Sequence, residues 1–304
     1  MLAPRVLKNF KVLASVLALL SATFSLPNSA SASSKVTTYK QIWSDEFSGK
    51  KGALPNSKYW GYDLGGLNQN GELQFYTKSN QNIALDGAGK LVITANRIAD
   101  QSMIPVSKDP VIEKMLNACI SCQFSSSRIK SAGKISVQYG RIEARIKVPS
   151  GEGTWPAFWM LGSDLLKGVP WPDARDIDVI ETKGSVINTA FGTIHGPGMP
   201  NAGAGLGSTY THTGLLSSGF HIYAIEWQKN KIDFYVDDEM YFSVTPTDQG
   251  AGKWVYNQPF FMILNLAMGG EFGGEIDPNL NKAQLVVDYI RIYAVNGVGK
   301  VFQR

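Results

Sequence analysis

Apolar and polar residues alternate along much of this chain, with the period of two that is typical of β-strands. Residues 141–148 are the clearest case, because four charged side chains fall on one face and apolar side chains on the other. Turn-forming pairs separate the segments, and a helical turn is expected only in short stretches such as 163–166. Further strands are expected at 91–95, 220–227, 232–236, 260–267 and 285–293. This pattern predicts an all-β fold, an antiparallel sandwich or barrel.

One expected strand carries acids at half of its positions: Asp176, Asp178 and Glu181 alternate with Ile and Val. Carboxylates are poor strand formers, so three in one strand indicate a use for them. Asp176 and Asp178 share a face, whereas Glu181 lies five positions after Asp176 and points the other way in a regular strand. One extra residue, a β-bulge, would bring Glu181 to the same face. Three acids on one face suit glycoside hydrolysis, which needs a nucleophilic or basic carboxylate and a protonated general acid.

The alternative is an edge strand with a solvated acidic face, and nearby tryptophans argue against it. Trp171 lies just upstream of the acids, and Trp155 and Trp159 precede it. Indole faces cover the apolar C–H faces of pyranose rings, so all three are candidate sugar platforms. Core packing is an equal alternative for Trp159, since Phe158 and Trp159 must face opposite sides of a strand. Trp171, in a loop, is the strongest candidate for stacking.

Residues 1–32 have the pattern of a secretory signal peptide: three cations, an apolar stretch at about 12–24 and a small-residue cleavage site ending at Ala32. The apolar stretch is shorter than the roughly 20 residues of a membrane span. Cleavage near Ala32 would leave residues 33–304 as a secreted catalytic domain, extracellular or periplasmic, and would lower the formal net charge from +4 to +1. Residues 33–304 contain no Lys/Arg cluster of the kind that binds nucleic acid or a membrane, so neither is expected as a partner. We expect a monomer.

The two cysteines, Cys119 and Cys122, lie in an expected surface loop at about 100–123. A zinc site would need a second pair of ligands, and a redox motif would need a βαβ setting and a reducing compartment. A local disulfide after secretion is the favoured interpretation, with two free thiols as the alternative. Neither gives the pair a catalytic role.

Motifs spread over most of residues 33–304 match one family pattern in order. They are found at 43–47, 70–77, 139–147, 155–161, 192–198, 220–227, 264–270 and 287–293. With these motifs the chain resembles glycoside hydrolase family 16, and within it the bacterial laminarinase-like endo-1,3-β-glucanases. The resemblance implies a β-sandwich jelly roll of two packed antiparallel sheets with a concave substrate cleft.

The resemblance also implies a retaining mechanism in which Asp176 is the nucleophile, Glu181 the acid/base and Asp178 the carboxylate that supports the nucleophile. It further matches the bulged form of the acidic motif. The family nucleophile is normally glutamate, so Asp176 retracts the carboxylate by about one C–C bond, roughly 1.5 Å. Three outcomes follow: a compensating backbone shift with full activity, a slow enzyme, or binding without catalysis. We favour an active enzyme, because Asp178, Glu181 and the tryptophans are all present.

Other positions follow from the family pattern. His195 is expected to bind sugar hydroxyls or a carboxylate, with a structural role as the alternative. Asn70, Glu72 and Asn265 are candidate cleft residues. No cofactor is required for the chemistry, but carboxylates at Glu46 and Asp288 match a structural calcium site of many relatives, and hard oxygen ligands suit calcium.

The expected partner is a polysaccharide, laminarin-type β-1,3-glucan cleaved internally. One alternative is a non-catalytic β-glucan-binding protein on the same fold, because Asp176 replaces glutamate. Another is an enzyme of the same family that acts on galactan or mixed-linkage glucan. The loops at 61–71 and 195–213 are expected to decide between substrates.

Overall fold

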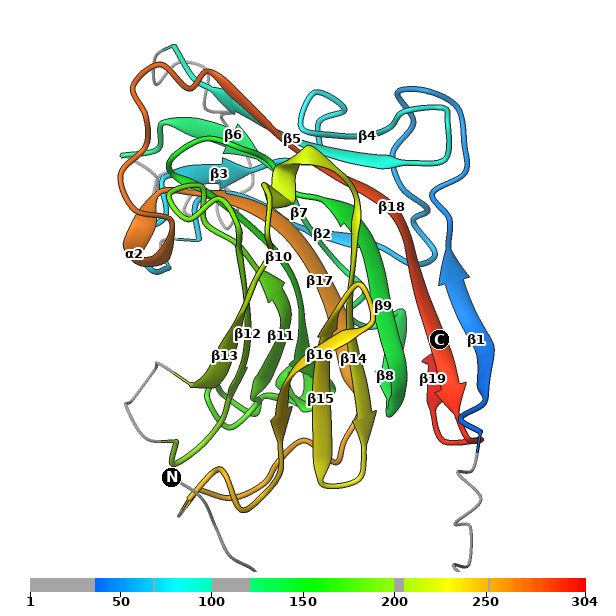
Figure 1. Cartoon of the computed structure of the whole chain (residues 1–304). Coiled ribbons are helices and arrows are strands. Elements are labelled where there is room, and N and C mark those ends of the chain that lie inside the picture. Colours follow the sequence, from blue (N-terminus) through cyan, green and yellow to red (C-terminus); the bar gives the residue numbers. More distant parts are fainter. Residues whose placement is uncertain (1–35, 68, 100–120, 200–204, 251) are drawn as a thin grey trace, which may run out of the picture. The chain divides into compact units, whose positions relative to one another are not determined.

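Two mostly antiparallel sheets stack face to face in the unit Thr37–Arg304, as the computed structural model shows (Figure 1). The structure describes residues 36–67, 69–99, 121–199, 205–250 and 252–304. The expected signal peptide and Cys119 therefore lie outside the described residues. Cys122 is disulfide-bonded, in agreement with the predicted bridge. No helix among the described residues is long and apolar enough to cross a membrane.

The ten-stranded sheet has the order β16-β15-β14-β9-β18-β5-β6-β3, with β1 paired to β18 and β4 to β5. All of its pairs are antiparallel except β3 with β6. Its strands are β1 (Tyr39–Asp45), β3 (Gln74–Tyr76), β4 (Ile83–Leu85), β5 (Leu91–Arg97), β6 (Phe124–Ser126), β9 (Gly140–Lys147), β14 (His221–Gln228), β15 (Lys231–Val236), β16 (Glu239–Val244) and β18 (Lys282–Val295).

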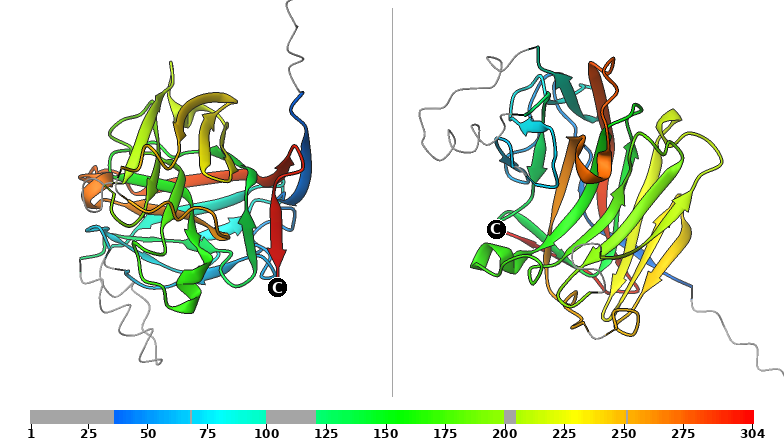
Figure 2. Two further views of the ribbon diagram at one scale, coloured as in Figure 1. Left: turned by 90° about the horizontal axis from the view of Figure 1, so that it is seen from below. Right: turned by 90° about the vertical axis from the view of Figure 1, so that its left-hand side faces the viewer.

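The nine-stranded sheet has the order β13-β12-β11-β10-β17-β7-β2, and β8 joins β17 to β19. Its strands are β2 (Gly61–Asp63), β7 (Arg128–Lys130), β8 (Ile135–Gln138), β10 (Thr154–Gly162), β11 (Asp176–Glu181), β12 (Thr189–His195), β13 (Leu206–Thr211), β17 (Phe260–Met268) and β19 (Lys300–Gln303). The described residues also form the short helical segments η2 (Ser163–Lys167), η3 (Leu216–Ser218) and α2 (Gly270–Gly273), and α2 packs against β10 (Figure 2).

Among the described residues, one large apolar core fills the space between the sheets, and two smaller apolar clusters lie outside it. Alternation decides which residues enter it: on β17, Phe260, Met262 and Leu264 are in the core, whereas Asn265 lies on the opposite face. Full burial of such side chains stabilises the fold by about 1.5–3 kcal/mol each. The outer face of the nine-stranded sheet is thereby free to carry polar chemistry.

All six strands expected from alternation are present, with ends that differ by a few residues, and the all-β sandwich is confirmed. The expected helical turn at 163–166 is the 3-10 helix η2. The prediction that residues 195–213 form one long loop is wrong, because β12 extends to His195 and β13 occupies Leu206–Thr211. Ser and Thr on this exposed edge strand hide the apolar alternation that identifies other strands.

Candidate active site

The acidic strand β11 contains the predicted bulge. Phe158 pairs with Ile180 and the next residue of β10, Trp159, pairs with Asp178, so β11 has one extra residue there. The pairing with β12 shifts at the same place. Val179 and Ile180 are consecutive, yet both lie in the apolar core. Two successive inward side chains reset the alternation, which turns Glu181 to the face that carries the other two acids.

Asp176 and Asp178 are nearly buried on this face, with 8% and 6% exposure. The Trp171 indole N–H donates to Asp176 Oδ2 at 3.3 Å, and His195 Nε2 lies 3.2 Å from Asp178 Oδ2. In the part of the chain that the structure describes, no lysine or arginine forms an ion pair with Asp176, Asp178 or Glu181. The acids are therefore desolvated without a strong counter-charge.

This environment favours protonated carboxyls. Burial, with a smaller effect of Asp178, raises the pKa of Glu181 to about 8. Burial also raises the pKa of Asp178 to about 7. The pKa of Asp176 is raised well above its usual value by burial and by Asp178, while His195 and the Trp171 N–H oppose the shift. Asp176 and Asp178 are neighbouring like charges, so the ionisation of one carboxyl disfavours the ionisation of the other.

Trp155 contacts the acid/base candidate instead of presenting an open face to solvent. Its indole is only 9% exposed, and its N–H donates to Glu181 Oε1 at 2.7 Å. Since Oε1 accepts this bond and a carbonyl oxygen is the better acceptor, the bond favours a proton on Oε2 of Glu181. The Trp155 ring also packs against Phe272 of α2, with centroids 5.1 Å apart.

The other predicted residues on the β10–β17 side form one hydrogen-bonded set. Trp159 Nε1 donates to Asn265 Oδ1 at 2.8 Å, and Asn265 Nδ2 lies 3.4 Å from the Tyr76 hydroxyl. Tyr76 in turn donates to Glu72 Oε2 at 3.4 Å, and Asn70 Nδ2 lies 3.5 Å from Glu72 Oε1. Glu72 also contributes to raising the pKa of Glu181, so this set reaches the acids.

Trp171 is the open aromatic surface of the site. It is 49% exposed, and its ring lies 6.3 Å from the His195 ring. Because it also donates to Asp176, Trp171 places a sugar-sized apolar face directly beside the nucleophile candidate.

Three residues around Glu181 were not predicted from the sequence: Lys183, Phe191 and Phe272. Phe191 pairs with Glu181 across β11 and β12, and its ring contacts Phe272 at 5.1 Å. The Lys183 ammonium lies over both rings, 5.3 and 5.0 Å from their centroids. Alternation on β12 could have identified Phe191, since it shares a face with His195.

The comparisons with known proteins agree with this geometry. The family model "Glycosyl hydrolases family 16" matches residues 71–291. This chain belongs to glycoside hydrolase family 16. It is 35% identical over 270 residues to a beta-glucanase of Rhodothermus marinus, covering 86% of this chain and 87% of that protein. The laminarinase catalytic domain of Thermotoga maritima superposes with a TM-score of 0.72 at 33% identity, covering 84% of this chain and 98% of that one. The endo-beta-1,3-glucanase of Pyrococcus furiosus gives 0.72 at 36% identity, covering 84% and 95%.

Membership in family 16 confirms the jelly-roll fold and makes the chain a glycoside hydrolase. Asp176, Asp178 and His195 each offer one oxygen or nitrogen atom, and these atoms lie within 4.8 Å of one another. Among the described residues, this group has the spacing to hold a metal ion. Glycoside hydrolysis by two carboxylates, where it operates, does not require a metal ion.

The carboxylates expected to bind calcium are engaged by arginines. Both Glu46 oxygens accept bonds from Arg291 at 2.9 Å, and Asp288 Oδ2 lies 2.6 Å from Arg145. A calcium ion at these carboxylates would have to compete with their pairing to Arg291 and Arg145. Calcium here stays a prediction, which a fall in melting temperature on chelation would support.

Proposed function

We propose that this glycoside hydrolase cleaves β-1,3-glucan internally with retention of configuration. The observation that carries the proposal is the bulged strand that sets Asp176, Asp178 and Glu181 on one face. Retaining enzymes need two carboxyls on one site, one ionised and one protonated. The similarity to a beta-glucanase and to laminarinase structures supports β-1,3-glucan as substrate.

In the first step, the Asp176 carboxylate attacks the anomeric carbon and forms a glycosyl ester, while Glu181 gives its Oε2 proton to the departing glycosidic oxygen. In the second step, Glu181 takes a proton from water, whose oxygen attacks the anomeric carbon and frees Asp176. Trp155 assists by holding Oε1 of Glu181. The raised pKa of about 8 keeps Glu181 protonated before bond cleavage at neutral pH.

Asp178 supports the nucleophile by taking the protonated form, since burial raises its pKa to about 7. The charge on Asp176 is favoured by His195 and by the Trp171 N–H, which both lower its pKa against the effect of burial. His195 lies on Asp178 Oδ2 and fixes its orientation. Trp171 stabilises the charged form of Asp176 by its N–H.

The backbone before Asp176 supports an active enzyme despite the shorter side chain. Arg175 has a φ of 41°, an uncommon conformation for a residue other than glycine. Its guanidinium is buried, pairs with Asp164 at 2.5 Å and donates to the Asp173 carbonyl at 2.6 Å. Such an anchored turn can re-aim the following carboxylate and offset the missing methylene. We further propose export, with cleavage near Ala32.

Reducing-sugar release from laminarin, with Glu181→Gln as control, tests the proposal. Wild type should release sugar, and NMR of the first products should show the β-anomer. If wild type binds laminarin but releases no more sugar than Glu181→Gln, the chain is a glucan-binding protein. Faster cleavage of a galactan or a mixed-linkage glucan in a polysaccharide panel would instead reassign the substrate.

A further inference from the structure

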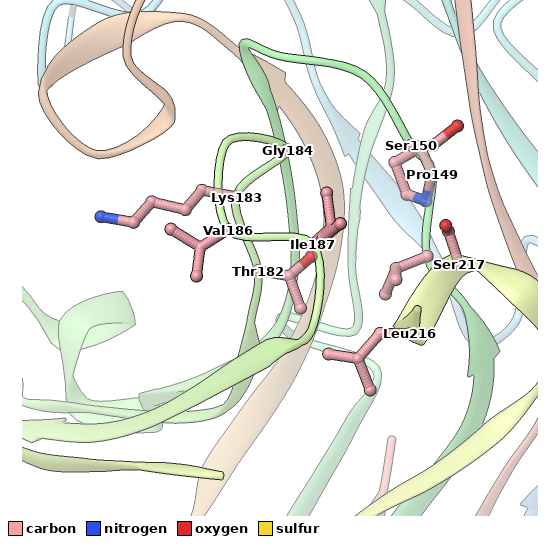
Figure 3. A pocket seen from close by; sticks show the side chains of 10 residues that line it. Pro149, Ser150, Thr182, Lys183, Gly184, Val186, Ile187, Leu216 and Ser217 are labelled. Carbon is pink, nitrogen blue, oxygen red and sulfur yellow. The ribbon is translucent and has the colours of Figure 1, made fainter. Parts of the chain in front are cut away.

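A cluster that we call the Phe–Lys wall, made of Lys183, Phe191 and Phe272, stands beside Glu181. Lys183 follows β11, Phe191 lies on β12 and Phe272 on α2. Lys183 borders a recess lined also by Thr182, Ile187 and Leu216, but its side chain points away from that recess (Figure 3). The ammonium is instead held over the two phenyl rings. The wall is therefore a built arrangement and not three independent surface side chains.

Two glycines hold the phenylalanine of α2 in place. Gly269 and Gly270 have φ values of 68° and 79°, which favour glycine. A Cβ on Gly270 would lie 2.5 Å from the Asn70 carbonyl oxygen, so only glycine lets α2 approach the 70–72 loop this closely. Phe272 is thus fixed between Trp155 and Phe191.

The lysine keeps its hydrogen-bonding capacity. Among the residues that the structure describes, no carboxylate forms an ion pair with Lys183. Contact with ring faces stabilises its charge without using its three N–H donors. The two half-buried phenyl rings offer apolar contact, and the ammonium at their faces offers hydrogen-bond donors. A pyranose ring needs both, because it has apolar C–H faces and polar hydroxyl groups.

The direction of the reaction decides which sugar meets this wall. Glu181 delivers its proton to the oxygen that leaves with the departing sugar, so that sugar lies against the surroundings of Glu181. Phe191 is the cross-strand neighbour of Glu181, and Phe272 packs on the indole that holds its Oε1. We propose that the Phe–Lys wall binds the glucosyl unit on the leaving-group side of the cleaved bond, which deepens the proposed function and rests on it.

Two substrates separate this role from acid catalysis. One is a β-1,3-glucan oligosaccharide, and the other is the β-glycosyl fluoride of a shorter one, which has no sugar on the leaving side. Phe272→Ala and Lys183→Met should each lower kcat/KM about threefold to tenfold on the oligosaccharide. The same variants should change the fluoride by less than about twofold and leave the alkaline limb of the pH profile in place.

The matched control is Phe302→Ala on β19, where Lys300 lies 4.8 Å above the Phe302 ring. This variant loses the same kind of contact outside the site and should cleave both substrates like wild type. Equal losses on both substrates, a moved alkaline limb, or no loss in either wall variant would overturn the proposal. If wild type cleaves neither substrate, the proposed function itself fails and the wall assignment falls with it.

Discussion

The two sides of Glu181 are built from different chemistry. Toward β17, Trp159, Asn265 and Tyr76 form a chain of hydrogen bonds that continues to Glu72. Toward β12, the Phe–Lys wall consists of ring contacts and a cation. A hydrogen-bonded set has strict geometric demands, whereas ring faces accept a sugar in several orientations. The β17 side is thus suited to select one sugar unit of the substrate. The Phe–Lys wall is suited to bind the departing sugar unit loosely and release it.

The largest effect is expected for Glu181→Gln, which removes the proton donor between the two sides. General acid/base catalysis contributes about 10²–10⁴-fold, so kcat on laminarin should fall by that factor. Polymer binding, measured by affinity electrophoresis, should persist because both sides remain intact. Glu275→Gln, at an exposed position, is the control and should keep full activity. Comparable activity in Glu181→Gln would remove this residue from the mechanism.

Asp176→Glu tests whether the site is adapted to the shorter acid. The added methylene would push the carboxylate against Trp171 and His195 in a nearly buried position. A misplacement near 1 Å can cost on the order of a hundredfold, so kcat should fall by about tenfold to a hundredfold. A higher kcat in the variant would mean instead that Asp176 is a weakened nucleophile.

Asn265→Ala breaks the hydrogen-bonded side while leaving the Phe–Lys wall untouched. Trp159 is half-buried and its N–H loses its acceptor, which costs at most the roughly 1–3 kcal/mol of a fully buried unpaired donor. The melting temperature should fall by a few degrees, and discrimination between glucan and galactan should weaken. Calorimetry and the polysaccharide panel measure both. If Asn265→Ala and Phe272→Ala lost the same activity on the fluoride substrate, the two sides of Glu181 would not differ in function.

The smallest effect is expected for Trp155→Phe, which keeps a ring beside Phe272 but removes the N–H. That N–H favours the ionised form of Glu181 and lowers its pKa, so its loss should raise the pKa. Activity needs protonated Glu181 and is lost as pH rises through about 8, so the alkaline limb should move up by roughly one pH unit. Trp254→Phe, which loses a bond to Asn257, should not move it.

Alternation in the sequence was enough to predict an all-β sandwich or barrel and the bulge of β11, while the family resemblance was needed to choose the sandwich. The parity of Asp176 and Glu181 allowed only one way to bring them to a common face. It also put Phe158 and Trp159 on opposite faces of β10. In the structure Phe158 lies in the core and Trp159 points toward Asn265. These are properties of one strand, and one strand can be interpreted without its neighbours.

Lateral neighbours could not be predicted in the same way. Phe272 reaches the site because two glycines turn the chain after β17, and nothing in the periodicity marks a four-residue helix there. Trp155 is a plausible sugar platform in the sequence, but packing by α2 buries it and leaves its N–H directed at Glu181. Such roles depend on strand order and loop closure, which a period of two does not contain.

The bulge in β11 makes the shared face of the three acids depend on whether the number of residues between them is odd or even. Deleting Val179 or Ile180 would restore strict alternation and still leave the three acids on one side. Inserting one residue between Asp178 and Glu181 would likewise leave the acids on one side if the strand became regular, but it would point Glu181 into the apolar interior if the bulge were kept. A change of one residue in length therefore keeps the chemistry only where the strand gives up its bulge.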